Sequence, residues 1–482
     1  MQVLVIIPAL ASVLLSAAPA LASSGEAAHS APEMPLYMIV PFVAMLLSIA
    51  VFPLVREHWW EKNSNKLIVS AVLGVPMLCY LLYRAFTEGE AAEHFFLHRI
   101  EHAIVFDYVP FIILLGSLFV ISGGIMLGGD LKATPRINAT FLAVGSVLAS
   151  FIGTTGAAML LIRPLLKTNS QRRHTVHTVI FFIFIVANIG GCLTPLGDPP
   201  LFLGYLRGVP FAWTFGLVLP WLAMNSTLIA IYLIWDTLAY RKEDPATLLA
   251  DEQEVEPLRI SGTINFLWLG GIVASVAFLN PNYLPFMEEQ PYFKFIREGT
   301  MLALVGISFL TTRRGLRRDN SFTMHPIIEV AALFIGIFVT MIPALILLEY
   351  HGSELGLSQN WHFFWITGSL SAFLDNAPTY VTFFTTATGM NLDQAAALAG
   401  QAAPEGMMWV GDHLIDEQIL VAISLGAVFM GAMTYIGNGP NFMVKAVAEE
   451  SGIKMPSFFG YMLYSCLILL PLLVLVTLIF IE

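Results

Sequence analysis

The sequence predicts an all-α polytopic membrane protein made of inverted repeats, each with a re-entrant hairpin and a broken transmembrane helix. Three observations predict this fold class. The composition is apolar with little charge, the loop charges alternate along the chain, and two matching Gly-Pro motifs occur in its two halves. We expect ten membrane spans, or eleven if an apolar N-terminal segment also crosses the membrane.

The composition is that of a membrane protein. Of 482 residues, 57% are hydrophobic and 12% are charged, whereas a soluble domain carries about 25% charged residues. Apolar runs long enough to cross about 30 Å of hydrocarbon as helices recur throughout the chain. No long stretch alternates between polar and apolar residues, which disfavours a β-barrel. The net charge of −11 disfavours a nucleic-acid-binding surface.

The apolar runs predict the following spans: 35–55, 67–84, 107–128, 176–205, 211–238, 263–280, 298–312, 326–348, 416–445 and 457–481. Residues 35–238 form the first repeat and residues 263–482 the second. A polar cytoplasmic linker, 239–262, joins them. Residues 1–22 resemble a signal peptide because a small-x-small pattern follows an apolar run. An uncleaved extra span is the alternative.

Two further apolar segments, 137–166 and 362–390, are predicted to be re-entrant hairpins. Loops rich in Lys and Arg lie in the cytoplasm, and both flanks of 137–166 are of this kind, with Lys132, Arg136, Lys167, Arg172 and Arg173. The flanks of 362–390 contain neither Lys nor Arg. We therefore expect the two hairpins to enter the membrane from opposite sides.

The predicted broken helices share a motif. Residues 194–202 read TPLGDPPLF and residues 434–442 read TYIGNGPNF, so Thr, Gly, Pro and Phe recur at an offset of 240 residues. Asp198 in the first copy corresponds to Asn438 in the second. Five predicted crossings separate the copies, and an odd number inverts the second. Inverted repeats with broken helices at the midplane are typical of secondary transporters.

The breaks provide candidate ion ligands. Gly and Pro interrupt the helical hydrogen-bond ladder, and the freed backbone groups are tolerated in a membrane where they line a cavity. Asp198 and Asp375 are the carboxylates at the breaks, and our hypothesis gives them a Na⁺ or proton site. Capping of a helix end is the structural alternative for each. Further candidate ligands at the breaks and hairpin tips are Thr154, Thr155, Thr194, Gly197, Asn376, Thr434, Gly437, Asn438 and Asn441.

At these residues the chain resembles the ion-transporter superfamily, which includes divalent-anion/sodium symporters and arsenite and citrate carriers. Residues 194–199 (TPLGDP) and 371–378 (SAFLDNAP) are most similar to motifs of the D-type bacterial sodium/proton antiporters. The resemblance implies two opposed hairpins, two broken helices and a homodimer. Two departures exist: the first hairpin tip, Gly153-Thr154-Thr155, lacks the Asn of carboxylate symporters, and the second break has Asn438 instead of an Asp.

These patterns predict a secondary active transporter of a bacterial-type inner membrane that exchanges Na⁺ for H⁺, and no enzyme activity. Its expected partners are small ions and the lipid bilayer, with Na⁺ and H⁺ as coupling ions and no cofactor. The alternative within this class is a sodium- or proton-coupled carrier of carboxylates such as citrate. A passive channel is disfavoured because opposed hairpins would block a continuous pore.

A membrane-embedded metal enzyme is the alternative from another class. It would use His94, His98 and His102, which recur every fourth residue beside several Glu. On a helix these histidines form one stripe, and adjacent pairs could bind a metal. The stripe is about 12 Å long, so its three members cannot share one ion. An amphipathic interfacial helix or an external pH-sensing patch explains the stripe without a metal.

Overall fold

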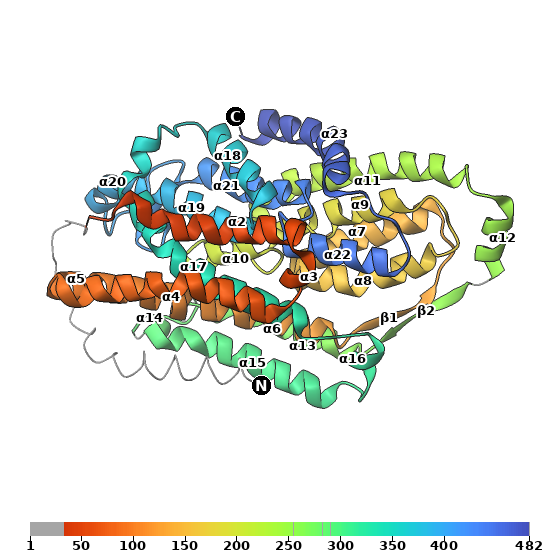
Figure 1. Ribbon diagram of the computed structural model, residues 1–482, viewed down its shortest axis with the longest axis horizontal. Helices are drawn as coiled ribbons and strands as arrows, with labels where there is room; N and C mark the ends of the chain where they lie inside the picture. The colour runs from red at the N-terminus through yellow and green to blue at the C-terminus, as the bar shows by residue number, and fades with distance from the viewer. Residues whose placement is uncertain (1–32, 254, 282, 290, 482) are drawn as a thin grey trace. The chain divides into compact units, whose positions relative to one another are not determined.

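The computed structural model describes residues 33–481 apart from 254, 282 and 290. The predicted signal peptide or extra span, residues 1–22, lies outside the described residues. Within the described part the chain is largely helical, as predicted, with two short two-stranded ladders in addition (Figure 1). It divides into two compact units. Unit 1 comprises the residues up to 112, 324–356 and 388–390, and unit 2 comprises the remainder.

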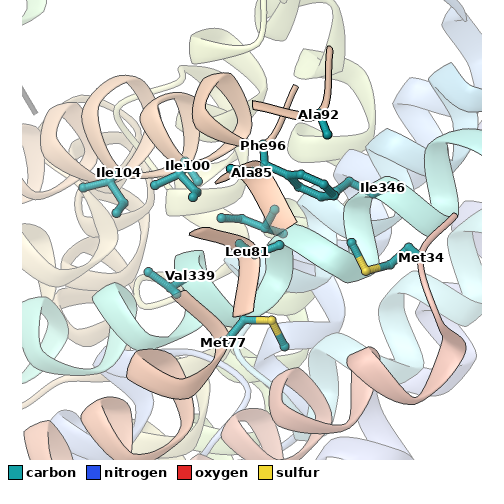
Figure 2. Packing of buried hydrophobic residues seen from close by; sticks show 12 residues of the cluster. Met34, Met77, Leu81, Ala85, Ala92, Phe96, Ile100, Ile104, Val339 and Ile346 are labelled. Carbon is teal, nitrogen blue, oxygen red and sulfur yellow. The ribbon is translucent and has the colours of Figure 1, made fainter. Parts of the chain in front are cut away.

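Unit 1 is built from long apolar helices. Its principal elements are η2 (Leu36–Ile39), α2 (Val40–Val55), α3 (Glu57–Trp60), α4 (Asn63–Thr87), α5 (Glu90–Glu101), the π-helix η3 (His102–Tyr108), α17 (His325–His351) and η7 (Gly352–Leu355). Helix α6 (Val109–Ser122) begins in this unit and continues into unit 2. The core of unit 1 joins α4, α5 and α17 through buried Met, Leu, Ile, Ala and Phe side chains (Figure 2).

Small residues let α4 and α17 approach closely. A Cβ at Gly336 would lie 2.7 Å from Cβ of Ser70, and a Cβ at Gly74 would lie 3.8 Å from Cα of Gly336. Such small residues four apart allow backbone contact between helices in a membrane. Two ion pairs add polar contacts between α17 and the other helices of unit 1. Lys66 pairs with Glu329 at 2.6 Å, and Arg99 pairs with Glu349 at 2.7 Å.

The first part of unit 2 contains the segments expected to form the first hairpin and the first broken helix. Its elements are β1 (Met126–Asp130), α7 (Pro135–Ile152), α8 (Thr154–Thr168), α9 (Val176–Ile185), η4 (Ile189–Leu193), α10 (Pro199–Leu206), η5 (Phe211–Leu217), α11 (Val218–Tyr240), α12 (Pro245–Gln253) and β2 (Glu256–Ser261). The expected linker thus contains α12 and β2. Strand β2 pairs antiparallel with β1, from Met126 opposite Ser261 to Asp130 opposite Glu256.

The second part of unit 2 contains the segments expected to form the second hairpin and the second broken helix. It contains α13 (Ile264–Phe278), α14 (Phe286–Glu289), η6 (Pro291–Lys294), α15 (Phe295–Thr311), α16 (Leu316–Asp319), α18 (Asn360–Phe373), α19 (Asn376–Gly389), α20 (Leu392–Ala397), β3 (Met407–Val410), β4 (His413–Asp416), α21 (Glu417–Met430), η8 (Gly431–Met433), α22 (Gly439–Glu450), α23 (Phe458–Val476) and the π-helix η9 (Thr477–Ile481). Strands β3 and β4 form an antiparallel hairpin.

The helices are interrupted at the positions where the sequence predicts breaks. Helices α7 and α8 pack against each other and are separated at Gly153, whose φ of 79° suits glycine. Helix α18 ends before Asp375 and α19 starts after it. The chain between η4 and α10, and that between η8 and α22, is non-helical. Pro lies in the first turn of α10 and of α22, where the missing N–H costs nothing.

The described residues contain eight helical stretches long and apolar enough to span a membrane: Leu36–Pro53, Asn63–Thr87, Glu90–Ser122, Pro135–Ile152, Val176–Leu193, Phe211–Tyr240, His325–His351 and Phe458–Ile481. The protein is therefore a multi-pass membrane protein, as predicted. Helices α13 and α21 are shorter apolar helices in predicted spans. The stretch Pro135–Ile152 is the first arm of the predicted hairpin, so its length alone does not distinguish a span from a hairpin arm. The inverted orientation of the repeats stays a prediction.

Candidate functional site

A buried carboxylate lies at the centre of the predicted site in unit 2. The Asp198 side chain is 1% exposed. Its Oδ1 accepts hydrogen bonds from the Thr154 hydroxyl and the Asn438 amide, each at 3.1 Å. Its Oδ2 accepts from the Asn376 amide at 2.6 Å. Four residues predicted from separate sequence segments therefore meet at one carboxylate.

Each of these four residues stands at the beginning of a helix. Thr154 and Asn376 are the first residues of α8 and α19, while Asp198 and Asn438 directly precede α10 and α22. A helix N-terminus carries a partial positive charge from its unpaired N–H groups. Residues at four such helix starts meet at the Asp198 carboxylate through their side chains. Among the described residues, no Lys, Arg or His is paired with it.

Asp198 and Asn438 occupy N-cap positions without capping their own helices. Their side chains are directed to other elements instead, which is unusual for Asp and Asn at a helix start. Asp375 behaves in the opposite way. It is half-buried, and its Oδ1 accepts a hydrogen bond from the Ala377 amide at 3.1 Å, so it caps α19. The capping alternative therefore describes the bond that Asp375 makes, but none of the bonds that Asp198 makes.

Asn188 forms a second layer of the site that the sequence analysis did not identify. It is fully buried and donates to Asn441 Oδ1 at 2.6 Å, while its own Oδ1 accepts from Asn438 at 3.2 Å. Asn441 in turn donates to the backbone carbonyls of Gly431 and Thr434. A signal for Asn188 does exist in the sequence. It is a polar residue inside the apolar run of residues 179–193, and buried polar residues in membrane segments are usually functional.

Thr194 and Thr434 lie outside the carboxylate's shell and make equivalent bonds. The Thr194 hydroxyl donates to the carbonyl of Ser150 in α7, and the Thr434 hydroxyl donates to the carbonyl of Ala372 in α18. The offset along the chain from Ser150 to Ala372 is the same as from Thr154 to Asn376. Both threonines thus join a broken helix to the hairpin segment of its own repeat.

The two predicted glycines are sites of close backbone approach. A Cβ at Gly197 would lie 2.1 Å from the Gly191 carbonyl oxygen, and a Cβ at Gly437 would lie 2.6 Å from the Gly431 carbonyl oxygen. The Gly197 carbonyl also accepts a hydrogen bond from the Thr154 amide at 2.8 Å. These glycines therefore shape the breaks and bring the tip of α8 to Asp198.

Two side chains of the predicted set, Asn376 and Thr155, differ from the others in how they relate to the hydrogen-bonded cluster around Asp198. Asn376 Oδ1 is buried and has no hydrogen-bond partner within the part of the chain that the structure describes, although a buried amide oxygen normally has a partner. Thr155 is half-buried and its side chain does not join the hydrogen-bonded cluster. The free Asn376 oxygen is thus a candidate ligand beside Asp198, whereas Thr155 is not brought to it.

The histidine stripe lies in unit 1. The rings of His94 and His98, and those of His98 and His102, are 6.2 Å apart, so the three follow one helix face as predicted. His102 Nδ1 lies 3.6 Å from an oxygen of Asp107. Within residues 33–481, apart from the gaps, no group of three His, Cys, Asp or Glu side chains is arranged to hold a metal ion.

Comparison with known proteins identifies the family. A protein family described as "Putative citrate transport" matches residues 31–481. The chain belongs to this citrate-transport family. It is also similar to uncharacterized transporters of Mycobacterium bovis and Mycobacterium tuberculosis. Each is 24% identical over 344 residues, which cover 68% of this chain and 73% of the relative.

Family and fold together make the protein a membrane transporter, and they point away from an enzyme. The family description fits the carboxylate-carrier alternative better than the sodium/proton exchange that the motifs alone suggested. The family spans both halves of the chain and both Gly-Pro breaks. The four residues that meet at Asp198 lie within the matched residues, and they form the candidate transport site.

Proposed function

We propose that this protein is a secondary active carrier that moves a small carboxylate such as citrate together with Na⁺ or H⁺. One observation carries the proposal: side chains from the starts of four helices meet at the carboxylate of Asp198. The match to a citrate-transport family supports the same substrate class.

The four helix ends favour a bound anion. Each N-terminus acts as roughly half a positive charge, so four of them supply about two positive charges, which offset the carboxylates of Asp198 and of Asp375 at α19. A proton or cation bound at either carboxylate leaves a surplus that suits an anionic group, and half-helix N-termini bind substrate carboxylates in other transporters with broken helices. A basic side chain is then not required for recognition, because backbone N–H groups supply the donors.

The coupling cation is assigned to Asp198. Among the described residues, its carboxylate accepts hydrogen bonds only from neutral groups, namely one hydroxyl and two amides. A buried carboxylate without a cationic side chain is stabilised by a bound cation or by protonation. Carboxylate and amide oxygens are ligands for hard cations, and Asn376 Oδ1 offers the free oxygen. Asp375 is the second proposed cation ligand, through the oxygen that does not cap α19.

Sodium/proton exchange is the second candidate, and the neutral surroundings of Asp198 also favour it. A carboxylate that holds either Na⁺ or H⁺ exchanges one for the other without an organic substrate. The two candidates share the cation site and differ in whether an anion must be present. The inner-membrane location, the homodimer and the inverted hairpins belong to the proposal as well, since loop charges and the family resemblance predict them.

The test uses purified protein in liposomes that contain a pH-sensitive dye. Inward gradients of Na⁺ or H⁺ are imposed with and without external radiolabelled citrate. We expect citrate to accumulate only with a cation gradient, and cations alone to leave the internal pH unchanged. A pH change driven by Na⁺ without citrate would instead establish the exchanger. Liposomes with the Asp198→Asn variant provide the matched blank for leakage.

A further inference from the structure

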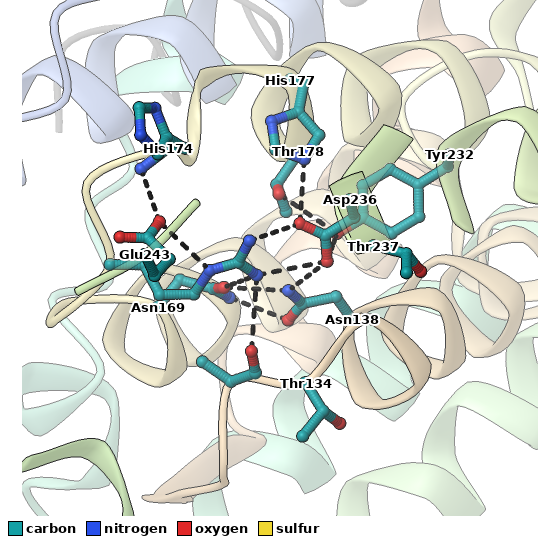
Figure 3. A network of polar contacts seen from close by, with 12 residues as sticks. Thr134, Asn138, Asn169, His174, His177, Thr178, Tyr232, Asp236, Thr237 and Glu243 are labelled. Atoms are coloured by element: carbon teal, nitrogen blue, oxygen red, sulfur yellow. Dashed lines mark hydrogen bonds and ion pairs between the residues drawn. The ribbon is translucent and has the colours of Figure 1, made fainter. Parts of the chain in front are cut away.

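A second polar cluster in unit 2 lies outside the transport site. The Arg172 guanidinium donates to the Asp236 carboxylate at 2.6 Å, and neither side chain has any exposed surface (Figure 3). His177 Nε2 lies 2.9 Å from the same carboxylate, and the Tyr232 hydroxyl donates to it at 3.1 Å. Loop charges alone made Arg172 a cytoplasmic marker, but the structure makes it the centre of a buried network.

The network fixes the loop before α9. The Glu243 carboxylate accepts hydrogen bonds from the backbone amides of Arg173 and His174, at 3.1 and 2.9 Å. It also lies 3.7 Å from Arg172 Nε. Groups in the protein interior therefore hold the backbone of this loop in place, while the side chains of Arg173 and His174 remain exposed.

An open pocket of about 540 Å³ adjoins this loop. Its polar rim consists of Arg173, His174 and Lys242, all exposed. Two aromatic residues, Trp235 and Tyr464, also line the pocket. Trp235 stacks on His177 at 6.0 Å with planes 6° apart and lies 6.0 Å from Tyr464. Aromatic rings of this kind gather at the level of lipid headgroups.

Much of the rest of the pocket wall is apolar and exposed. Ile231, Ile234 and Leu238 recur at helical spacing on α11 and line the pocket, and the side chains of Ile234 and Leu238 are 66% and 54% exposed. From Ile231 to Leu238 the stripe is roughly 10 Å long. This is about a third of the ~30 Å hydrocarbon thickness, so the upper part of one acyl chain can lie along it.

We propose that this pocket binds an anionic phospholipid, with the phosphate at Arg173, His174 and Lys242 and an acyl chain along the α11 stripe. Charge complementarity supports the choice. The buried carboxylate of Asp236 pairs with Arg172, and that of Glu243 accepts hydrogen bonds from backbone amides. Neither carboxylate therefore pairs with the rim side chains, which face outward. Basic pockets between membrane helices are suited to anionic headgroups. A free phosphate would use the rim but not the stripe.

The experiment compares lipid binding to three proteins by native mass spectrometry from neutral detergent, in equimolar phosphatidylglycerol and phosphatidylcholine. These are the unaltered chain, the rim variant Arg173→Gln/Lys242→Gln, and the control Arg313→Gln/Arg314→Gln, which removes two exposed arginines elsewhere. Each rim cation contributes about 1 kcal/mol, so the rim variant should bind phosphatidylglycerol about 30-fold more weakly. The control should bind it as the unaltered chain does.

Equal binding by the rim variant and the unaltered chain would overturn the proposal. A second variant, Ile234→Ser/Leu238→Ser, separates lipid from phosphate. It should weaken phosphatidylglycerol binding while the rim stays intact. No change in this variant, together with full competition by millimolar inorganic phosphate, would show an inorganic anion site and also overturn the proposal. Folding of every variant is checked by its melting temperature.

Discussion

Asn438 donates a hydrogen bond to Asp198 over 3.1 Å, although 240 residues separate them in the chain. The same offset relates the two Gly-Pro motifs, so these residues are equivalent positions of the two repeats in contact with each other. One position carries a charge and the other a neutral amide. This asymmetry gives the site a single central carboxylate, and the predictions below depend on it.

Asp198→Asn should abolish cation-coupled uptake and leave the protein folded. The new amide oxygen can accept from Thr154 and Asn438, and the Asn376 amide can turn its free oxygen toward the new NH₂ group. The hydrogen bonds survive while the charge is lost. Citrate uptake in liposomes measures transport, and Asp319→Asn on the exposed surface is the matched control. Full uptake by Asp198→Asn would remove this residue from the coupling mechanism.

Asn438→Asp should make the protein's stability depend on pH. It would bring a second carboxylate to Asp198, and two carboxylates at this distance resist simultaneous ionisation. One shared proton relieves the repulsion, so the Asn438→Asp variant is most stable at low pH and loses stability as the pH rises. Melting temperatures between about pH 5 and pH 9 measure the effect. Asn438→Ser, which adds no charge, should show a loss that does not change with pH. A flat profile for Asn438→Asp would contradict the contact.

Asp375→Asn separates capping from cation binding. The amide oxygen can still accept from the Ala377 amide, so α19 keeps its cap. If the second oxygen binds Na⁺, the apparent Na⁺ affinity of uptake should fall by about tenfold or more, which corresponds to ~1.4 kcal/mol. The Na⁺ dependence of uptake gives this affinity. An unchanged affinity would leave Asp375 with a capping role alone.

The sequence was sufficient to predict the residues that meet at Asp198. Thr154 and Asn376 stand at the tips of the predicted hairpins and Asn438 stands at the second Gly-Pro break. Polar residues in apolar segments need polar partners in a membrane. Their pairing with Asp198 could not be predicted, because it depends on how four helix starts are oriented. The pairing of Asn188 was missed because it precedes its break by several residues. A search for any polar residue within an apolar run would have found it.

The fold was predicted to the level of helices and breaks, but some roles of charged residues were not. Arg172 was used only as a topology marker, whereas it is buried against Asp236. Loop-charge rules count cations without reference to their partners, and a carboxylate 64 residues away can bury one of them. The expected linker likewise contains β2, because its pairing with β1 is a long-range contact that local patterns do not reveal.

The opposed hairpins can be tested by reporter fusions. A reporter enzyme active only in the cytoplasm should be active after Lys167 and inactive after Asn391, and a reporter active only outside should give the reverse. The reason is that basic residues flank the first hairpin segment while none flank the second. If both fusions report the same side, the inverted arrangement is wrong, although the contacts around Asp198 would stand.

Gly437→Ala should destabilise the second break, whereas Gly439→Ala should not. A Cβ at Gly437 would lie 2.6 Å from the Gly431 carbonyl oxygen and 2.8 Å from that of Ser371, and backbone atoms cannot yield at low cost. A Cβ at Gly439, two residues later, would meet nothing within 4 Å. Overpacking of this kind costs about 1–3 kcal/mol, so the melting temperature of Gly437→Ala in detergent should fall clearly. Equal melting temperatures for the two variants would mean that the backbone at the break is looser than these contacts require.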